Sequence, residues 1–168
     1  EIGAEWRLSP WWGGDPFQTQ VGLELYGQTA WWRTTFTKPE TDYARASAIL
    51  RVAVPLVYPT WRLGIEAGGG TTWGEAPLQR SWFLGGASTL RGFPASALMG
   101  SSFARGRVEV ARTLDVGTFS LFGDVGWAGL RSDFDTGDLL YGIGIGSGVL
   151  DGLFRFDLSH GLNGPLKQ

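Results

Sequence analysis

One arginine and two later acids are the residues of this sequence whose types and spacing could build a buried ionic site. Arg91 stands in an apolar, glycine-rich stretch that ends in Leu-Arg-Gly-Phe at residues 90–93. Glu109 and Asp124 follow on two segments in which apolar and polar residues alternate. Because a guanidinium can donate paired hydrogen bonds to carboxylates, we expect a loop that folds back and is held by Arg91 against these acids.

Two other arginines offer the same acids a different partner. Arg105 and Arg107 lie on the segment that carries Glu109. If they pair with the acids, Arg91 is a solvated loop residue, and an exposed ion pair is worth about 1 kcal/mol or less. If Arg91 is buried with the acids, removing one partner costs roughly 3–5 kcal/mol. Residue spacing alone leaves both interpretations open.

The segment 43–56 indicates which kind of element would position such a site. Its even-numbered positions are all apolar, whereas its odd-numbered positions include Arg45 and Arg51. A period of two predicts a strand, longer than the usual 5–6 residues or so and as long as the roughly 9–11 that cross a bilayer. An arginine facing lipid at mid-membrane costs about 2–4 kcal/mol, so both arginines must face inward.

The same alternation recurs along the whole chain. We expect further strands at residues 2–8, 17–27, 29–37, 61–70, 103–113, 117–128, 138–149 and 152–161. Short turns are expected near residues 27–28, 58–60, 114–116 and 150–152, and longer loops at 9–16, 38–42, 71–102 and 129–137. Short periplasmic turns and long extracellular loops are typical of bacterial outer-membrane barrels. The sequence therefore predicts an all-β, antiparallel transmembrane β-barrel in the bacterial outer membrane.

Composition narrows the class of protein. The 168 residues allow one domain, with no cysteine for disulfides and a single histidine, His160, which alone cannot hold a metal. The net charge of −2 gives no reason to expect nucleic acid. No run of about 18 apolar residues occurs, which excludes a transmembrane helix in this sequence. No G-x-S-x-G motif occurs, so the catalysis of any linked hydrolase would lie upstream of these residues. In these residues we expect no enzyme, catalytic residue, metal or cofactor.

The predicted strands number nine, and an odd number is unusual. Bacterial single-chain barrels have even strand numbers, and an open sheet edge in lipid would leave backbone groups unpaired. We therefore expect residues 1–168 to be a partial barrel domain, the C-terminal part of a larger barrel whose first strands and last strand lie outside this chain. A soluble β-sandwich is the alternative, but its strands would be shorter and its outer faces polar.

The loop at 71–102 is far longer than the usual hairpin connection of about 2–5 residues. It is rich in apolar residues, including Trp82, Phe83 and Leu84, so its composition does not favour disorder. Glycines at every second position from 142 to 148 leave room against the inner wall. We expect segment 90–93 to fill that room, which would insert this extracellular loop into the barrel lumen.

Segment 90–93 resembles the arginine-glycine-aromatic motif in the sixth extracellular loop of the outer-membrane insertase and translocase superfamily, or bacterial surface antigen family. Residues 122–126, Phe-Gly-Asp-Val-Gly, resemble its aromatic-x-Asp-x-Gly motif, and residues 108–110 resemble its preceding acidic strand. Residues 153–158 are similar to its penultimate strand. The resemblance covers about residues 61–165, and the family includes the BamA and TamA assembly factors and the transporters of two-partner secretion.

The resemblance implies a sixteen-stranded barrel, of which this chain would hold strands seven to fifteen. The family's arginine docks against lumenal motifs, which implies a loop-holding site made of Arg91, Gly92, Phe93, Glu109, Asp124 and Gly126. The implied function is assembly and insertion of outer-membrane proteins, or protein translocation across the outer membrane. The implied partners are the lipid bilayer, unfolded outer-membrane or secreted clients, and periplasmic or envelope subunits.

Two other functions remain open at this point. The barrel could anchor or export an enzyme such as a patatin-like lipase, whose catalytic residues would then lie upstream of this chain. It could also be a passive pore or structural barrel within a larger envelope complex. The family's periplasmic repeats, its first six strands and its final strand are absent from these residues.

Overall fold

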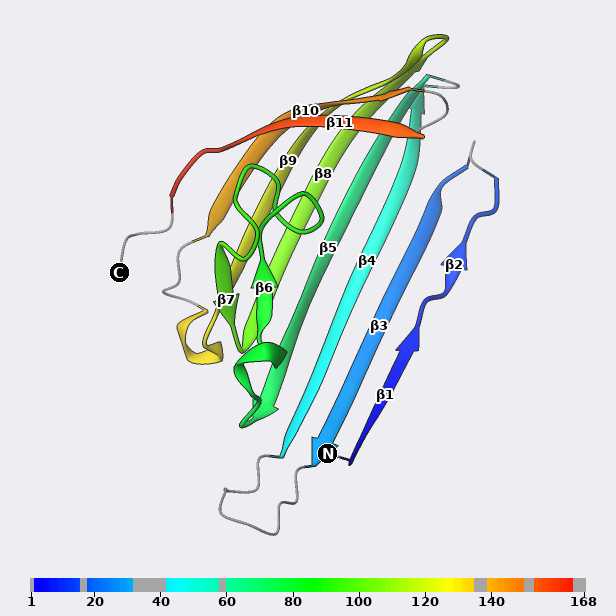
Figure 1. Ribbon diagram of the computed structural model, residues 1–168. Helices are drawn as coiled ribbons and strands as arrows, with labels where there is room; N and C mark the ends of the chain where they lie inside the picture. The colour runs from blue at the N-terminus through cyan, green and yellow to red at the C-terminus, as the bar shows by residue number, and fades with distance from the viewer. Residues whose placement is uncertain are drawn as a thin grey trace.

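The computed structural model describes residues 2–15, 18–31, 42–57, 60–134, 139–149 and 153–164. Within these ranges the strands form one antiparallel sheet of nine strands and a separate two-stranded hairpin. Figure 1 shows a long, curved sheet with the hairpin lying in its hollow. Among the described residues, no helix has the length and hydropathy needed to cross a membrane.

Neighbours along the chain are neighbours in the large sheet. Its order is β1 (Ile2–Leu8), β3 (Gln20–Trp31), β4 (Tyr43–Val57), β5 (Trp61–Gly74), β8 (Ser102–Leu114), β9 (Gly117–Gly129), β10 (Leu140–Val149) and β11 (Phe154–Gly161). The short β2 (Trp11–Trp12) pairs with β3. The hairpin consists of β6 (Trp82–Leu84) and β7 (Leu98–Gly100), and two single 3₁₀ turns are η1 (Leu78–Arg80) and η2 (Arg131–Asp133).

The predicted all-β, antiparallel fold is confirmed. Strands occur where alternation predicts them, at 2–8, 43–56, 61–70, 103–113 and 117–128, and in the described parts of 138–149 and 152–161. The two-residue turn between β8 and β9 is also confirmed. The turns predicted at 58–60 and 150–152 fall largely outside the described residues. Period-two patterning succeeds here because it reflects which face each side chain occupies.

The turn predicted at residues 27–28 is wrong. β3 runs unbroken through Gly27 to Trp31, so the strand predicted at 29–37 is not separate, and its residues 32–37 lie outside the described part. Gly27 pairs with Trp6 of β1, and a Cβ at Gly27 would collide with the Trp6 indole. This glycine makes room for a neighbouring aromatic ring and does not reverse the chain.

The ninth strand is β2, which lies within the segment predicted as the loop 9–16. Trp11 of β2 pairs with Gly22, and the indole again covers the place of a Cβ. β1 and β2 pair with successive parts of β3, so they form a single sheet edge that is interrupted near Pro10. The described sheet is therefore eight full strands wide. The predicted count of nine strands is confirmed, but β2 takes the place of the strand predicted at 29–37, and the nine described strands occupy eight positions across the sheet.

The sheet remains open in the described part of the chain. One edge is formed by β1 with β2 and the other by β11, and these edges do not pair with each other. No closed barrel is formed by these residues. Each edge strand carries a row of backbone N–H and C=O groups that pair with no further strand among the described residues.

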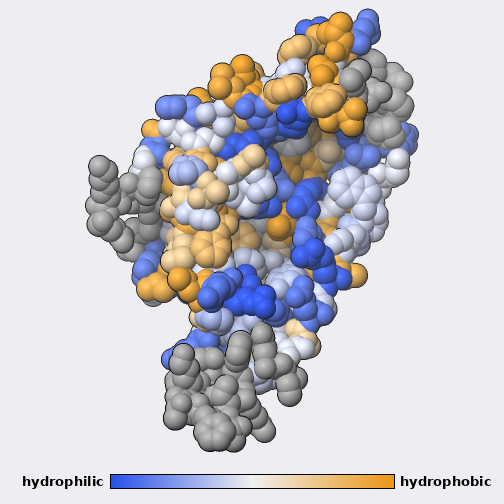
Figure 2. Space-filling model, viewed as in Figure 1, coloured by the Kyte–Doolittle hydropathy of each residue, from blue (hydrophilic) through white to orange (hydrophobic). Residues whose placement is uncertain are grey.

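The two faces of the sheet differ in chemistry. The inner face carries Arg45, Arg51 and Asp124 and is covered in part by the hairpin, whereas the outer face carries exposed apolar side chains. Figure 2 shows hydrophilic side chains gathered in the hollow beside the hairpin. Leu84 of β6 packs on Phe103 and Ala128, and these three buried residues form the small core that fixes the hairpin to the sheet.

Candidate functional site

The loop that carries Arg91 spans residues 75–101, slightly less than predicted, because β5 continues to Gly74. Trp82 of its hairpin packs on Phe103 with 4.7 Å between ring centroids and donates a hydrogen bond from Nε1 to Thr72 at 3.0 Å. The guanidinium carbon of Arg45 lies 4.0 Å from the centroid of the same indole. The hairpin is thus seated on the inner face before the chain reaches Arg91.

The chain forms a compact, hydrogen-bonded turn just before Arg91. Thr89 accepts a hydrogen bond from the Gly85 amide at 2.8 Å and donates one to the Gly85 carbonyl at 2.7 Å. The Gly86 amide donates to the Phe93 carbonyl at 3.0 Å. Gly85 and Gly86 have φ of 136° and 77°, a region that only glycine adopts readily. These contacts present residues 90–93 to the inner face as a rigid unit.

Arg91 is bound directly by Asp124. Its Nε and Nη2 donate to the two carboxylate oxygens at 2.9 and 2.8 Å, and its own backbone amide donates to Oδ2 at 2.9 Å. The side chain of Arg91 is 3% exposed and that of Asp124 is 0% exposed. Paired, charge-assisted bonds of this kind are among the strongest in proteins. The backbone bond also fixes the main chain of the loop, which a side-chain contact alone would not.

Two further acids complete the surroundings of the guanidinium. Arg91 Nη1 donates to Glu109 on β8 at 3.1 Å, and Asp157 on β11 lies 3.6 Å from the same nitrogen. Both predicted acids therefore contact Arg91, and a third, Asp157, was not predicted. The period-two pattern places Asp157 on the inner face, so its sequence position did contain a signal for this role.

Two other arginines balance the charge of the acids. Arg107 donates to both oxygens of Asp124, from Nε at 3.0 Å and from Nη2 at 3.1 Å. Arg155 donates from Nη2 to Glu109 at 2.9 Å and from Nε to Asp157 at 3.0 Å. Asp124 thus binds Arg91 and Arg107 together. The alternative interpretation is right only in that Arg107 pairs with this acid, because Arg91 is buried and not a solvated loop residue.

These six residues are here called the ionic cluster: Arg91, Glu109, Arg107, Asp124, Arg155 and Asp157. Three positive and three negative charges meet in it, so it is neutral as a whole. Burial alone lowers the pKa of Arg91, but its hydrogen bonds to Asp124 and Glu109 outweigh burial and raise that pKa above its ordinary value.

Phe122 is a partner of Arg91 that reasoning from charge alone misses. The guanidinium carbon lies 3.3 Å from the centre of the Phe122 ring, on the inner face of β9. Stacking of a guanidinium on an aromatic face is favourable, and more so when both are shielded from water. Phe122 is two residues from Asp124, so one strand supplies both the ring beneath Arg91 and the carboxylate beside it.

Gly92 and Phe93, which follow Arg91, lie very close to β11. Gly92 has φ of 92°, and a Cβ there would lie 2.7 Å from the His160 carbonyl carbon of β11. A Cβ at Gly161 would lie 2.7 Å from the Phe93 ring. Of the glycine row predicted to make room for the loop, Gly142 does so: a Cβ there would collide with the Arg91 carbonyl oxygen. Glycines on both the loop and the wall make this contact possible.

The remaining predicted residues lie beside the ionic cluster. Gly126 faces the loop, and a Cβ there would lie 3.2 to 3.3 Å from methyl groups of Leu84 and Leu90. Gly144 lies beneath Phe122, not beneath the loop as predicted for the whole row. Arg105, the other alternative partner, instead binds Glu66 at 2.9 Å and so belongs to a second group of ion pairs around Arg51.

Gly142→Ala is expected to displace the loop and lower the free energy of unfolding by about 1–3 kcal/mol, the usual cost of overpacking. The added methyl would meet the Arg91 backbone, which cannot move without losing its bond to Asp124. The matched control is Gly64→Ala, because a Cβ at Gly64 has only the Glu109 carbonyl oxygen nearby, at 3.8 Å. Urea unfolding of both variants checks this, and equal midpoints would contradict it.

The described residues contain no group of three or more His, Cys, Asp or Glu side chains that could hold a metal ion. The geometry of the ionic cluster holds the loop against β8, β9 and β11. Comparison of the chain with models of known protein families finds no match, and comparison with curated proteins finds none either.

Proposed function

We propose that this chain is part of the wall of a bacterial outer-membrane barrel that inserts outer-membrane proteins or translocates proteins across that membrane. The observation that carries the proposal is the docking of Arg91 from a long loop onto Asp124 and Glu109 of adjacent strands. The loop-arginine, acidic-strand and aromatic-x-Asp-x-Gly elements occur in the order that the resemblance to the insertase and translocase superfamily requires.

The chemistry of the two faces supports a membrane location. Outward side chains such as Leu121, Phe156 and Leu158 are 65%, 67% and 73% exposed, an arrangement that water disfavours and lipid accepts. The ion pairs lie on the opposite, inner face. In a sixteen-stranded barrel, the nine strands, which occupy eight positions because β1 and β2 share one edge, would be strands eight to fifteen, whereas the sequence predicts seven to fifteen.

The loop has a clear task in such a barrel. Held on the inner wall, it fills part of the lumen and ties β8, β9 and β11 together through one guanidinium. A client strand would then be templated at a separate seam by backbone pairing, which needs no cofactor. Periplasmic or envelope subunits would deliver the unfolded client to that seam.

The test is exchange of Arg91 for alanine in the intact protein, followed by an assay of client assembly or secretion. We expect assembly to fall at least about tenfold, because about 1.4 kcal/mol of lost loop docking already changes a population tenfold. Arg62→Ala is the matched control, since Arg62 is also inward but bonds only Gln20 among the described residues. Unchanged client assembly in Arg91→Ala, with normal protein levels, would remove the loop from the mechanism.

A further inference from the structure

The outer face carries one charged residue that the proposed function does not use. Across the outward positions of the large sheet, the described strands contain a single Lys, Arg, Asp or Glu side chain, Arg112 on β8. It lies two residues before the end of the strand, next to the short turn to β9. Its guanidinium carbon is 5.4 Å from the ring centroid of Trp61, the first residue of β5.

The register places Arg112 within a row of directly paired residues. Trp61 pairs with Arg112, Arg112 with Phe119, Phe119 with Ser147, and Ser147 with Phe156. These five residues come from five adjacent strands and lie at one level of the wall, near the rim that holds the short turns. Three aromatic rings and one cation on such a rim have the composition of a membrane-interface belt.

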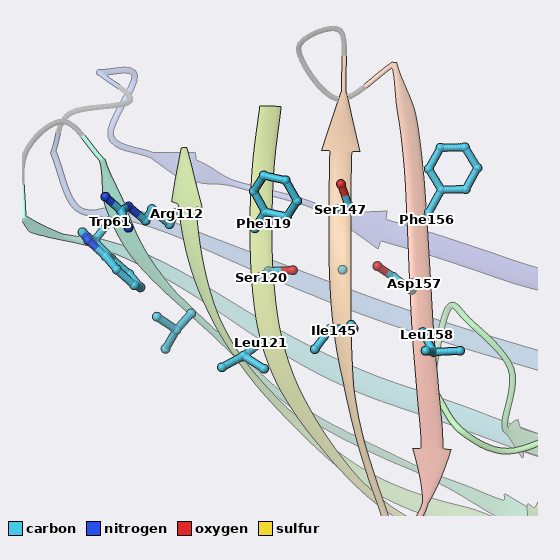
Figure 3. Close-up of a pocket in the computed structure, with 12 residues that line it drawn as sticks. Trp61, Arg112, Phe119, Ser120, Leu121, Ile145, Ser147, Phe156, Asp157 and Leu158 are labelled. Atoms are coloured by element: carbon cyan, nitrogen blue, oxygen red, sulfur yellow. The ribbon is translucent and has the colours of Figure 1, made fainter. Parts of the chain in front are cut away.

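The next outward row is entirely aliphatic. Val110 pairs with Leu121, Leu121 with Ile145, and Ile145 with Leu158. The two rows border a groove of about 600 Å³. Figure 3 shows the two levels: Arg112, Phe119 and Phe156 toward the turns, and Leu121, Ile145 and Leu158 one step further along the strands.

We propose that this groove binds one anionic phospholipid of the periplasmic leaflet, with its phosphate at Arg112 and an acyl chain along the aliphatic row. The inference rests on the proposed membrane span, in which the short-turn rim is periplasmic. Charge complementarity selects the occupant. Among the described residues, no carboxylate pairs with Arg112. A headgroup with net negative charge would supply the missing counter-charge.

A zwitterionic lipid fits less well. Its ammonium group would sit beside the guanidinium and oppose the attraction of the phosphate. Arginine recognises phosphate by paired hydrogen bonds, and the Trp61 ring orients the guanidinium for them. One basic residue near an anionic membrane surface is worth about a fivefold preference, which sets the expected size of the effect.

The test uses the intact protein reconstituted in phosphatidylcholine vesicles, with spin-labelled phosphatidylglycerol or spin-labelled phosphatidylcholine as the probe. We expect wild-type protein to bind the phosphatidylglycerol probe about fivefold more strongly. Arg112→Gln should abolish that preference. Arg131→Gln, which removes an exposed arginine of η2 at the opposite rim, should leave it unchanged.

A second pair of variants tests the acyl-chain groove without changing charge. Leu121→Trp fills the groove and should lower the phosphatidylglycerol preference at least about twofold, whereas Leu50→Trp on the outer face of β4 should not. Insertion into the vesicles with no preference, or a preference that Arg112→Gln leaves intact, would overturn the lipid site while the membrane span stands. Failure of the intact protein to insert at all would overturn both.

Discussion

Asp124→Asn is expected to lower the free energy of unfolding by about 3–5 kcal/mol, the largest single effect within the ionic cluster. The aspartate accepts three hydrogen bonds from Arg91 and two from Arg107, and its side chain is 0% exposed. Asparagine keeps the shape but turns one acceptor into a donor that faces two guanidinium groups. Two positive charges would then lose their shared counter-charge.

Asp157→Asn gives the matched comparison for this experiment. Asp157 also contacts Arg91 and Arg155, but its side chain is 21% exposed and its nitrogen–oxygen distance to Arg91 is 3.6 Å. Water can replace part of what is lost there, so a loss of about 1 kcal/mol is expected. Urea titration of both variants in the same detergent checks the ratio. Equal losses would mean that burial does not set the strength of these ion pairs.

Arg91→Lys is expected to cost about 2–4 kcal/mol although it keeps the positive charge. Arg91 uses Nε, Nη1 and Nη2 on two different acids while its flat face lies on Phe122. A single ammonium group can neither fork onto Asp124 and reach Glu109 together nor stack flat on a ring. Charge alone is therefore insufficient, and the loop should detach from the inner face more often.

Limited proteolysis of the loop at residues 75–101 measures this detachment. Chymotrypsin is suitable because its sites, such as Phe83 and Phe93, are the same in all variants. Cleavage in Arg91→Lys should be at least about tenfold faster than in wild type if opening precedes cleavage. Arg62→Lys, a conservative change elsewhere on the inner face, should match wild type. A lysine variant as resistant as wild type would show that shape and stacking add nothing to charge.

The strands were largely predictable because arginines lie at alternate positions, on one face of a strand, while apolar residues occupy the other face. Arg45 and Arg51 set the faces of β4, and the same alternation in β5, β8 and β9 gives strands that the structure contains. The failure at Gly27 has an equally local cause. Glycine permits turns, but it also makes space for a ring on the next strand, and the sequence does not contain the cross-strand pairing with Trp6 that distinguishes the two.

The candidate site was only partly predictable, since strand sequences report faces but not contacts across a loop. Glu109 and Asp124 could be named because both are inward acids close in sequence to Arg91. Asp157 and Arg155 are inward as well, but the curvature that brings β11 to the loop is a property of the whole sheet. The contact between Phe122 and Arg91 could not be predicted from charges, because it depends on the flat face of the guanidinium lying on the ring.

The ionic cluster also constrains the order in which the molecule can mature. Its members are separated by up to about seventy positions in the chain, and Arg155 and Asp157 belong to the last strand that the structure describes. Contacts between distant parts of a chain form late, because the intervening polymer must first be organised. The hairpin pairings among β1 to β5 are closer in sequence and can therefore form before Arg91 reaches its acids. Docking of the loop then follows the pairing of β8, β9, β10 and β11, because its acids come from β8, β9 and β11.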